Sequence, residues 1–306
     1  MAHINAIVES LRRPALGSRE RARFATVAVE ARRDGTAIGE FSAFVVDVSM
    51  TDGSSHFLVV SARHCVTRAQ FEGATIALRV PLMPQAIDRA NPPYVWETVA
   101  IPIDGWIHSQ ETDASVAPLP FDQLPENSFI TAWERNYFVG VAFQIFSPNV
   151  LIFGRASLGD QSIVVRRVGT LATSENPSVS LEIEPDTRRS VRVYVVEANV
   201  TAGMSGGLVL WTNGIGSGEN VALGLVHGYA YHGESAARSW SKGVDDESTQ
   251  RALERTQMEV EAARNGLVYV IRGGDILPLI DATACRFARE RGVPDPVVVA
   301  WERDRR

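Results

Sequence analysis

Short apolar runs, bounded by turn-forming residues, follow one another along the chain from about residue 24. The first five are rich in β-branched and aromatic side chains, and Gly, Asp, Asn or Pro lies between them. Because no long helical pattern interrupts these runs, they predict an all-β barrel or sandwich. The five predicted strands are Phe24–Glu30, Ile38–Val48, Phe57–Ser61, Ala74–Val80 and Val95–Ile103.

A second group of strands follows the segment Pro118–Glu134. This segment carries two Leu-Pro dipeptides and little periodicity, which predicts a linker between two domains. The strands predicted after it are Phe138–Phe146, Gln161–Ala172, Ser178–Ile183, Val191–Glu197, Gly207–Trp211, Val221–Tyr229 and Gly266–Ile271. The chain therefore has two β-rich halves.

Three segments show helical patterns. Residues 4–12 place their apolar side chains on one face, and residues 245–264 have a helical composition typical of an exposed insertion. An amphipathic helix is predicted over Ile276–Arg291, ended by Gly292 and Pro294. The predicted organisation is an extension (1–22), a first barrel (23–117), a linker (118–134), a second barrel (135–275) and a helix with a tail (276–306).

Composition narrows the classes of function. The chain has 306 residues, 45% of them hydrophobic and 22% charged, as in an ordinary globular protein. Its net charge of −6, without a long Lys/Arg run, argues against a nucleic-acid partner, and no apolar stretch is long enough to cross a membrane. The N-terminus lacks the pattern of a secretory signal, so a cytoplasmic location is expected. The sequence allows two states for its two cysteines, Cys65 and Cys285: a single bridge between them or two buried thiols.

Three local motifs carry candidate chemistry. His64 follows an apolar strand that ends in small residues, and Asp113 opens a short apolar strand. Ser205 lies within Gly203-Met204-Ser205-Gly206-Gly207, just before another strand. Taken singly, such a histidine is usually structural, such an aspartate a turn former and such a glycine-rich serine motif a turn. All three in this order, spread over two β-rich halves, point to a catalytic constellation.

At these residues the chain resembles the trypsin-like (chymotrypsin-fold) serine peptidase family of the bacterial type. The resemblance runs from about Ile38 to Ile280 and includes Gly224–Gly228, which looks like the wall of a specificity pocket. It implies two six-stranded-type antiparallel β-barrels, the chymotrypsin-like double barrel, with a C-terminal helix. Met204 stands where family members activated by cleavage carry Asp. That mode of activation is therefore not expected, and the chain either folds directly to a competent site or is gated by a partner.

The resemblance also implies roles for single residues. His64 would be the general base, Asp113 would orient it and Ser205 would be the nucleophile. The backbone amides of Gly203 and Ser205 would form the oxyanion hole, for which glycine has suitable backbone freedom. No metal or cofactor is expected to take part.

The specificity pocket is carried over from the family in the same way. Its residues would be Asn199, Val200, Val226, His227, Gly228 and Tyr229. No Asp occupies the base of this pocket, which disfavours strong preference for Arg or Lys. His227 has two interpretations, a pocket group that favours acidic substrates or a structural residue. Strand alternation favours the structural one, since His227 lies one position from the histidine of glutamate-specific relatives.

The predicted function is that of a serine endopeptidase acting on a protein or peptide substrate through an acyl-enzyme. The alternative is a catalytically silent or partner-gated chymotrypsin-like domain that acts as a binding module. The 245–264 segment is the candidate contact for a regulatory protein, against the simpler interpretation of a solvated insertion. A non-peptidase esterase would share the mechanism and differ only in substrate.

Overall fold

The computed structural model describes residues 17–82, 96–138, 149–158, 161–172, 176–201, 203–212, 220–229 and 266–292. The helices predicted at residues 4–12 and 245–264 lie outside these ranges. Of the predicted strand Phe138–Phe146, only the first residue is described.

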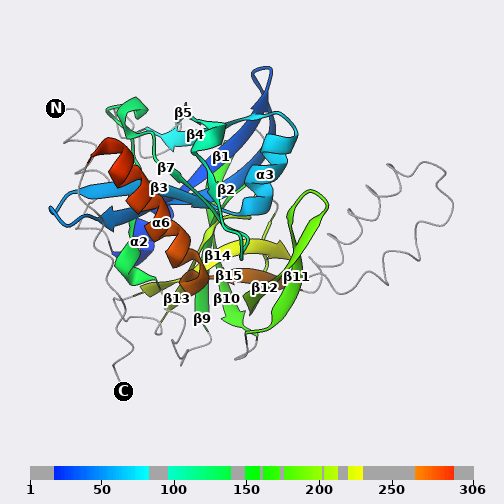
Figure 1. The fold of residues 1–306 in the computed structure, drawn as a ribbon. Helices are drawn as coiled ribbons and strands as arrows, with labels where there is room; N and C mark the ends of the chain where they lie inside the picture. Colours follow the sequence, from blue (N-terminus) through cyan, green and yellow to red (C-terminus); the bar gives the residue numbers. More distant parts are fainter. Residues whose placement is uncertain are drawn as a thin grey trace, which may run out of the picture.

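Strands make up most of the described chain, and they fall into two antiparallel sheets (Figure 1). The first half contains α2 (Ser18–Ala25), β1 (Thr26–Arg33), β2 (Thr36–Ser49), β3 (Ser55–Ser61), α3 (Arg63–Phe71), β4 (Thr75–Pro81), β5 (Trp96–Ile101), η1 (Ile103–Gly105), β6 (Ile107–His108), β7 (Ser115–Pro118), η2 (Phe121–Gln123), β8 (Trp133–Glu134) and η3 (Arg135–Tyr137). The second contains β9 (Asn149–Leu158), β10 (Gln161–Leu171), β11 (Ser178–Glu184), β12 (Thr187–Glu197), β13 (Leu208–Thr212), β14 (Asn220–Tyr229), β15 (Leu267–Arg272) and α6 (Gly273–Arg291).

The first sheet has the strand order β5-β4-β1-β2-β3-β7-β6, and β8 pairs with β2 in parallel. The second has the order β10-β9-β13-β14-β15-β12-β11, and an additional pairing of β10 with β12 closes six of its strands into a ring. Within the described chain the all-β architecture of two barrel-type sheets with a C-terminal helix is confirmed.

Two strands explain why the sequence shows continuous apolar runs instead of alternation. On β2, Phe44 and Val46 face a cluster shared by both sheets, while Val45 faces the core of the first sheet. On β13, Leu208 faces the shared cluster and Val209 the core of the second sheet. Strands buried on both faces need apolar residues at every position, so the alternation is lost.

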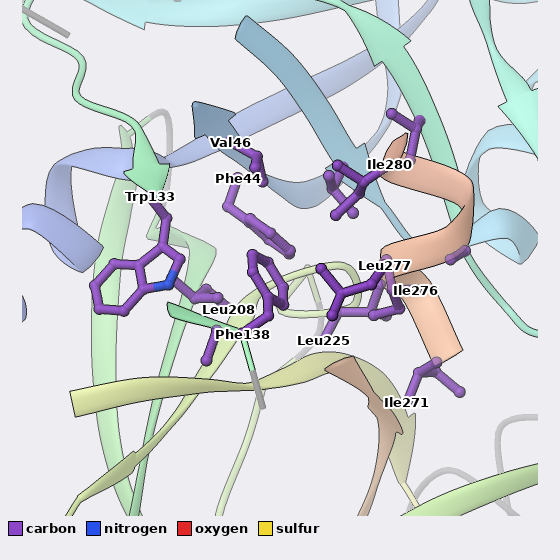
Figure 2. Close-up of a cluster of buried hydrophobic side chains, with 14 of the residues drawn as sticks. Phe44, Val46, Trp133, Phe138, Leu208, Leu225, Ile271, Ile276, Leu277 and Ile280 are labelled. Atoms are coloured by element: carbon purple, nitrogen blue, oxygen red, sulfur yellow. The ribbon is translucent and has the colours of Figure 1, made fainter. Parts of the chain in front are cut away.

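The cluster shared by the two sheets also contains one face of α6 (Figure 2). Ile276, Leu277 and Ile280 of this helix pack there beside Leu225 and Ile271 of the second sheet. Because α6 contacts strands of both sheets, it fastens the two together. The described helices include none that is long and apolar enough to cross a membrane.

The structure also contains elements that the apolar runs do not indicate. The short helices α2 and α3 and strand β9 were not predicted. Segment 118–134, predicted as a linker, contains β8, and Leu124 and Ile130 from it are buried in the core of the first sheet. Helix α6 begins at Gly273, three residues before the predicted start, and ends at Arg291 as predicted.

Candidate active site

Helix α3 begins at Arg63, directly after strand β3, and carries His64 in its first turn. The first N–H groups of a helix have no partner within the helix, and no side chain of the N-cap residue Ala62 supplies one. Asp113 does so instead, because its Oδ1 accepts a hydrogen bond from the backbone N–H of His64 at 2.8 Å. The carboxylate thus fixes the backbone of His64 as well as its side chain.

The other oxygen of Asp113 is shared by two imidazole rings. His64 Nδ1 lies 2.7 Å and His227 Nδ1 lies 2.6 Å from Asp113 Oδ2. The two rings meet edge to face, with their centroids 4.7 Å apart. The side chain of Asp113 is fully buried, that of His227 is 10% exposed and that of His64 is 26% exposed. Of the three, His64 is therefore the group that a ligand reaches most readily.

A β-bulge places His227 at this site. In the pairing of β14 with β15, Val226 lies opposite Val270 and Gly228 lies opposite Tyr269, so His227 has no partner of its own. Such an extra residue re-aims its side chain relative to the regular alternation of a strand. The side chain of His227 is thereby directed at Asp113.

The Ser205 turn is held against the start of α3. Gly206 has φ +85°, and a Cβ added there would lie 2.1 Å from the carbonyl oxygen of Ser42 and 3.1 Å from the backbone nitrogen of Ala62. The carbonyl of Ser205 accepts the Ser42 N–H at 2.9 Å. Only glycine permits this approach. Ser205 is thus brought beside the helix that carries His64.

The Nε2 nitrogen of His64 contacts a thiol. Cys65 Sγ lies 3.2 Å from His64 Nε2, and among the described residues no hydrogen bond joins Ser205 to His64. The Oγ of Ser205 instead lies near Gly228, since a Cβ added at Gly228 would lie 3.8 Å from it. Apart from the chain neighbours of Gly228, no other described residue comes within 4 Å of that position.

The backbone around Gly203 leaves two amides unused. Gly203 has φ +88°, and its carbonyl accepts the Ser42 hydroxyl at 2.6 Å. Within the described ranges, neither the N–H of Gly203 nor that of Ser205 donates a hydrogen bond. Free N–H groups on a turn of this kind are suited to bind an anionic oxygen.

The pKa values of the three linked groups differ. Burial by itself opposes ionisation of Asp113, but the two imidazole rings outweigh it and hold the pKa of this carboxyl well below its usual range. For His64, burial is outweighed by Asp113 and Cys65, so its pKa lies well above 6.5. For His227, burial outweighs the attraction of Asp113, so its pKa is lowered. His64 therefore binds a proton more strongly than His227 does.

Within the described part of the chain, the same three residues form the one group that could hold a metal ion, since their ligand atoms lie within 4.8 Å of one another. Around zinc, with bonds of about 2.0–2.1 Å, two tetrahedral ligand atoms are separated by roughly 3.3 Å. The distances of 2.6 and 2.7 Å between each nitrogen and the carboxylate oxygen are shorter than this. These distances are those of hydrogen bonds between each ring and the carboxylate.

A tether from the second sheet steadies the helix that carries His64. The buried guanidinium of Arg63 donates to the carbonyl of Ser109 and forms an ion pair with Glu184 at the end of β11. Thr67, one turn along α3, donates to the carbonyl of Ile183 at 3.2 Å. The contacts with Glu184 and Ile183 join the helix of the first sheet to the second sheet. Neither was anticipated from the sequence.

The residues carried over as a specificity pocket separate into groups. Asn199 is exposed, whereas Val200 and Val226 are buried in the core of the second sheet. His227 faces Asp113, and Gly228 faces Ser205. Tyr229 is the last residue of β14.

The two cysteines do not pair. Cys65 and Cys285 are both free thiols of intermediate exposure. Cys65 packs against the shared apolar cluster while its sulfur contacts His64.

No known family profile matches the chain, and no curated protein matches it. Similar solved structures include the inactive form of Rv3671c protease of M. tuberculosis, with 14% identity and a TM-score of 0.43, over 90% of this chain and 95% of that chain. Deg5 is another, with 13% identity and a TM-score of 0.43, over 73% of this chain and 84% of that chain. Both TM-scores are below 0.5, so the site is interpreted from its own geometry.

Proposed function

We propose that this chain is a serine endopeptidase whose triad is His64, Asp113 and Ser205. The observation that carries the proposal is the link between Asp113 and His64 beside the Ser205 turn. Asp113 Oδ2 lies 2.7 Å from His64 Nδ1, which orients the opposite nitrogen, Nε2, as a proton acceptor. The raised pKa of His64 suits a group that takes a proton as a hydroxyl attacks.

The chemistry follows from these positions. As Ser205 Oγ bonds to the carbonyl carbon of a peptide, its proton passes to His64 Nε2, and the carbonyl π electrons move to oxygen. The N–H groups of Gly203 and Ser205, which donate to no described residue, would stabilise that oxyanion. His64 then gives the proton to the leaving amine, which leaves an acyl-enzyme. Water, deprotonated by the same nitrogen, releases the acid and restores Ser205.

Substrate would enter beside Gly228, where the lack of a side chain leaves space next to Ser205 Oγ. We expect a Gly228→Ala variant to raise KM for peptides more than it lowers kcat.

Because no Asp lies among the proposed pocket residues, cleavage after Arg or Lys should be weak. A fluorogenic peptide library tests this, and a dominant preference for Arg or Lys would refute the pocket assignment.

The experiment that tests the proposal is intact-protein mass after treatment with a fluorophosphonate probe. The wild type should gain one adduct, while Ser205→Ala and His64→Ala should gain none. Ser54→Ala, which alters an exposed turn far along the chain from Ser205, is the matched control and should label like the wild type. In peptide hydrolysis, Ser205→Ala should lower kcat by a factor on the order of 10⁶. An adduct that persists in folded Ser205→Ala would disprove the assigned nucleophile.

A second candidate function is a gated form of the same domain, which acts as a binding module until a partner or substrate frees the base. The contact of Cys65 Sγ with His64 Nε2 at 3.2 Å favours it, because that nitrogen is the one that Ser205 needs. If the thiol restrains the base, Cys65→Ala should label faster than the wild type. Unchanged labelling of Cys65→Ala would remove this candidate's support, and lost labelling would identify Cys65 as the reacting group.

A further inference from the structure

His227 shares an oxygen atom of Asp113 with the proposed base, and the proposed mechanism leaves it without a task. We propose that His227 is a positioning residue that holds the Asp113 carboxylate from the second sheet and so sets the orientation and basicity of His64. This inference rests on the proposed function for its effect on rate. Its effect on the titration of His64 can be measured without any catalysis.

The carboxylate is held at three points. His64 N–H binds Oδ1 at 2.8 Å, while His64 Nδ1 and His227 Nδ1 bind Oδ2 at 2.7 and 2.6 Å. An ionised carboxylate only accepts hydrogen bonds, so both rings must carry their proton on Nδ1. If His227 were absent, both remaining contacts would come from His64 alone. Among the residues that the structure describes, His227 therefore supplies the one anchor on this oxygen that is independent of His64.

The anchor comes from a different sheet than the group it holds. Asp113 precedes β7 of the first sheet, whereas His227 lies at the bulge of β14 in the second. The hydrogen bond between them spans the interface that the site occupies. Because the side chain of His227 is only 10% exposed, solvent has little access to compete for this bond. The contact therefore fixes Asp113 relative to the sheet that carries Ser205.

Sharing the oxygen also has an electrostatic consequence. A carboxylate that accepts a second hydrogen bond is a weaker base and attracts the His64 imidazolium less strongly. His227 does not add a repelling charge, since burial keeps its pKa below 6.5. His227 thereby keeps the pKa of His64 lower than it would be if Asp113 accepted a bond from His64 alone.

Other charged or titratable groups face this cluster. Cys65 on α3 contacts His64, Glu182 on β11 attracts a proton toward His227, and Arg63 interacts with Asp113. None of these changes in a substitution of His227. A shift in the pKa of His64 in such a variant is therefore attributable to the lost hydrogen bond.

The test compares His227→Leu with His227→Asn, whose side-chain nitrogen Nδ2 takes a position close to that of Nδ1 and can donate the same bond. Both changes are made in a Ser205→Ala background, and the His64 ring is titrated by NMR, with His56 as an internal control. We expect His227→Leu to raise the pKa of His64 by about one unit and His227→Asn to leave it near the parent value. If His227→Leu does not fold, His227→Ala replaces it in the same comparison.

In chains with Ser205 restored, His227→Leu should lower kcat by about 10- to 100-fold with little change in KM, because the base is misplaced, and His227→Asn should recover most of the loss. An unchanged or lowered His64 pKa in His227→Leu, or an equal shift in His227→Asn, would overturn the inference. If the pKa shifts as expected while the wild type shows no hydrolysis or labelling, the inference holds and the proposed peptidase function fails.

Discussion

At the scale of single residues, proton position decides what the site does. Asp113 keeps its charge because two imidazole rings donate to it, and His64 gains proton affinity from the same carboxylate. A general base must lose its proton before it can accept one from the nucleophile, so in the proposed mechanism the working form of His64 is the neutral ring.

We therefore expect kcat/KM for a peptide to rise with pH, with a midpoint above 6.5. The raised pKa of His64 sets the sign, since the ring stays protonated and inactive to a higher pH than a free imidazole. Asp113→Asn should lower both this midpoint and kcat, the latter by a factor of about 10⁴. A pH–rate profile of both proteins measures this, and a wild-type midpoint at or below 6.5 would contradict it.

Gly206→Ala should destabilise the fold by about 2–4 kcal/mol, because the new Cβ would meet backbone atoms and the residue has a positive φ. Gly53→Ala is the matched control. It has a similar φ, +81°, but open space around it, so only the backbone cost of about 1 kcal/mol applies. Urea unfolding of both variants checks the difference, which should be at least about 1 kcal/mol.

The sequence predicts only part of the site. The motifs around His64, Asp113 and Ser205 indicate a common constellation through their residue types and their order along the chain alone. The contact of His227 with Asp113 depends on a bulge whose register no local pattern reveals. Alternation along the strand favours a structural role for His227, but it cannot name the partner.

At the scale of elements, a buried ion pair fastens helix α6 to η3. Arg135 of η3 makes two hydrogen bonds to Asp281 of α6, with Nε to Oδ1 at 2.9 Å and Nη2 to Oδ2 at 2.5 Å. Both partners are largely buried. This pair ties the end of the segment between the two sheets to the closing helix.

We expect Asp281→Asn to lower the free energy of unfolding by about 1–3 kcal/mol, because the buried guanidinium of Arg135 loses its charged partner. The matched control lies on the same helix. Glu290→Gln breaks the exposed pair with Arg286 and should cost less than about 0.5 kcal/mol. Equal effects of the two substitutions in urea unfolding would contradict the role assigned to Arg135 and Asp281.

Missed elements have local physical causes. Strand β9 contains Gly154, which resembles a strand end in sequence, yet a Cβ there would lie 2.9 Å from Met204 Cβ. The glycine thus makes room for a packed side chain. Helix α3 was missed because its N-cap, Ala62, offers no capping side chain and Asp113 performs that task from a distant segment.

At the scale of the whole molecule, one apolar cluster joins the two sheets. Phe138 is fully buried in it and lies 6.1 Å from Phe44, centroid to centroid. Figure 2 shows these rings between the sheets, beside Leu277 of α6. Because the site draws Asp113 and His64 from one sheet and Ser205 from the other, this cluster maintains the geometry of the site.

Phe138→Ala should therefore cost about 3–5 kcal/mol of stability and reduce fluorophosphonate labelling in parallel. Phe71→Ala is the control, because this ring is 78% exposed and its loss should change neither quantity measurably. Thermal unfolding and labelling of both variants at one temperature provide the comparison. Full labelling of a strongly destabilised Phe138→Ala would show that the site tolerates loosening of the interface.

The division of the site between two sheets also sets an order of events during synthesis. His64 and Asp113 leave the ribosome roughly 90 residues before Ser205, which at about 5–20 residues per second is a delay of roughly 5–20 s. During that interval the emerging chain holds a base without a nucleophile. Even after Ser205 follows, β15, which joins β14 to β12 in the second sheet, and helix α6 are still to be made. If the proposed function holds, a nascent chain built in this way cannot cut itself or its neighbours until the segments that follow Ser205 have been made and have folded.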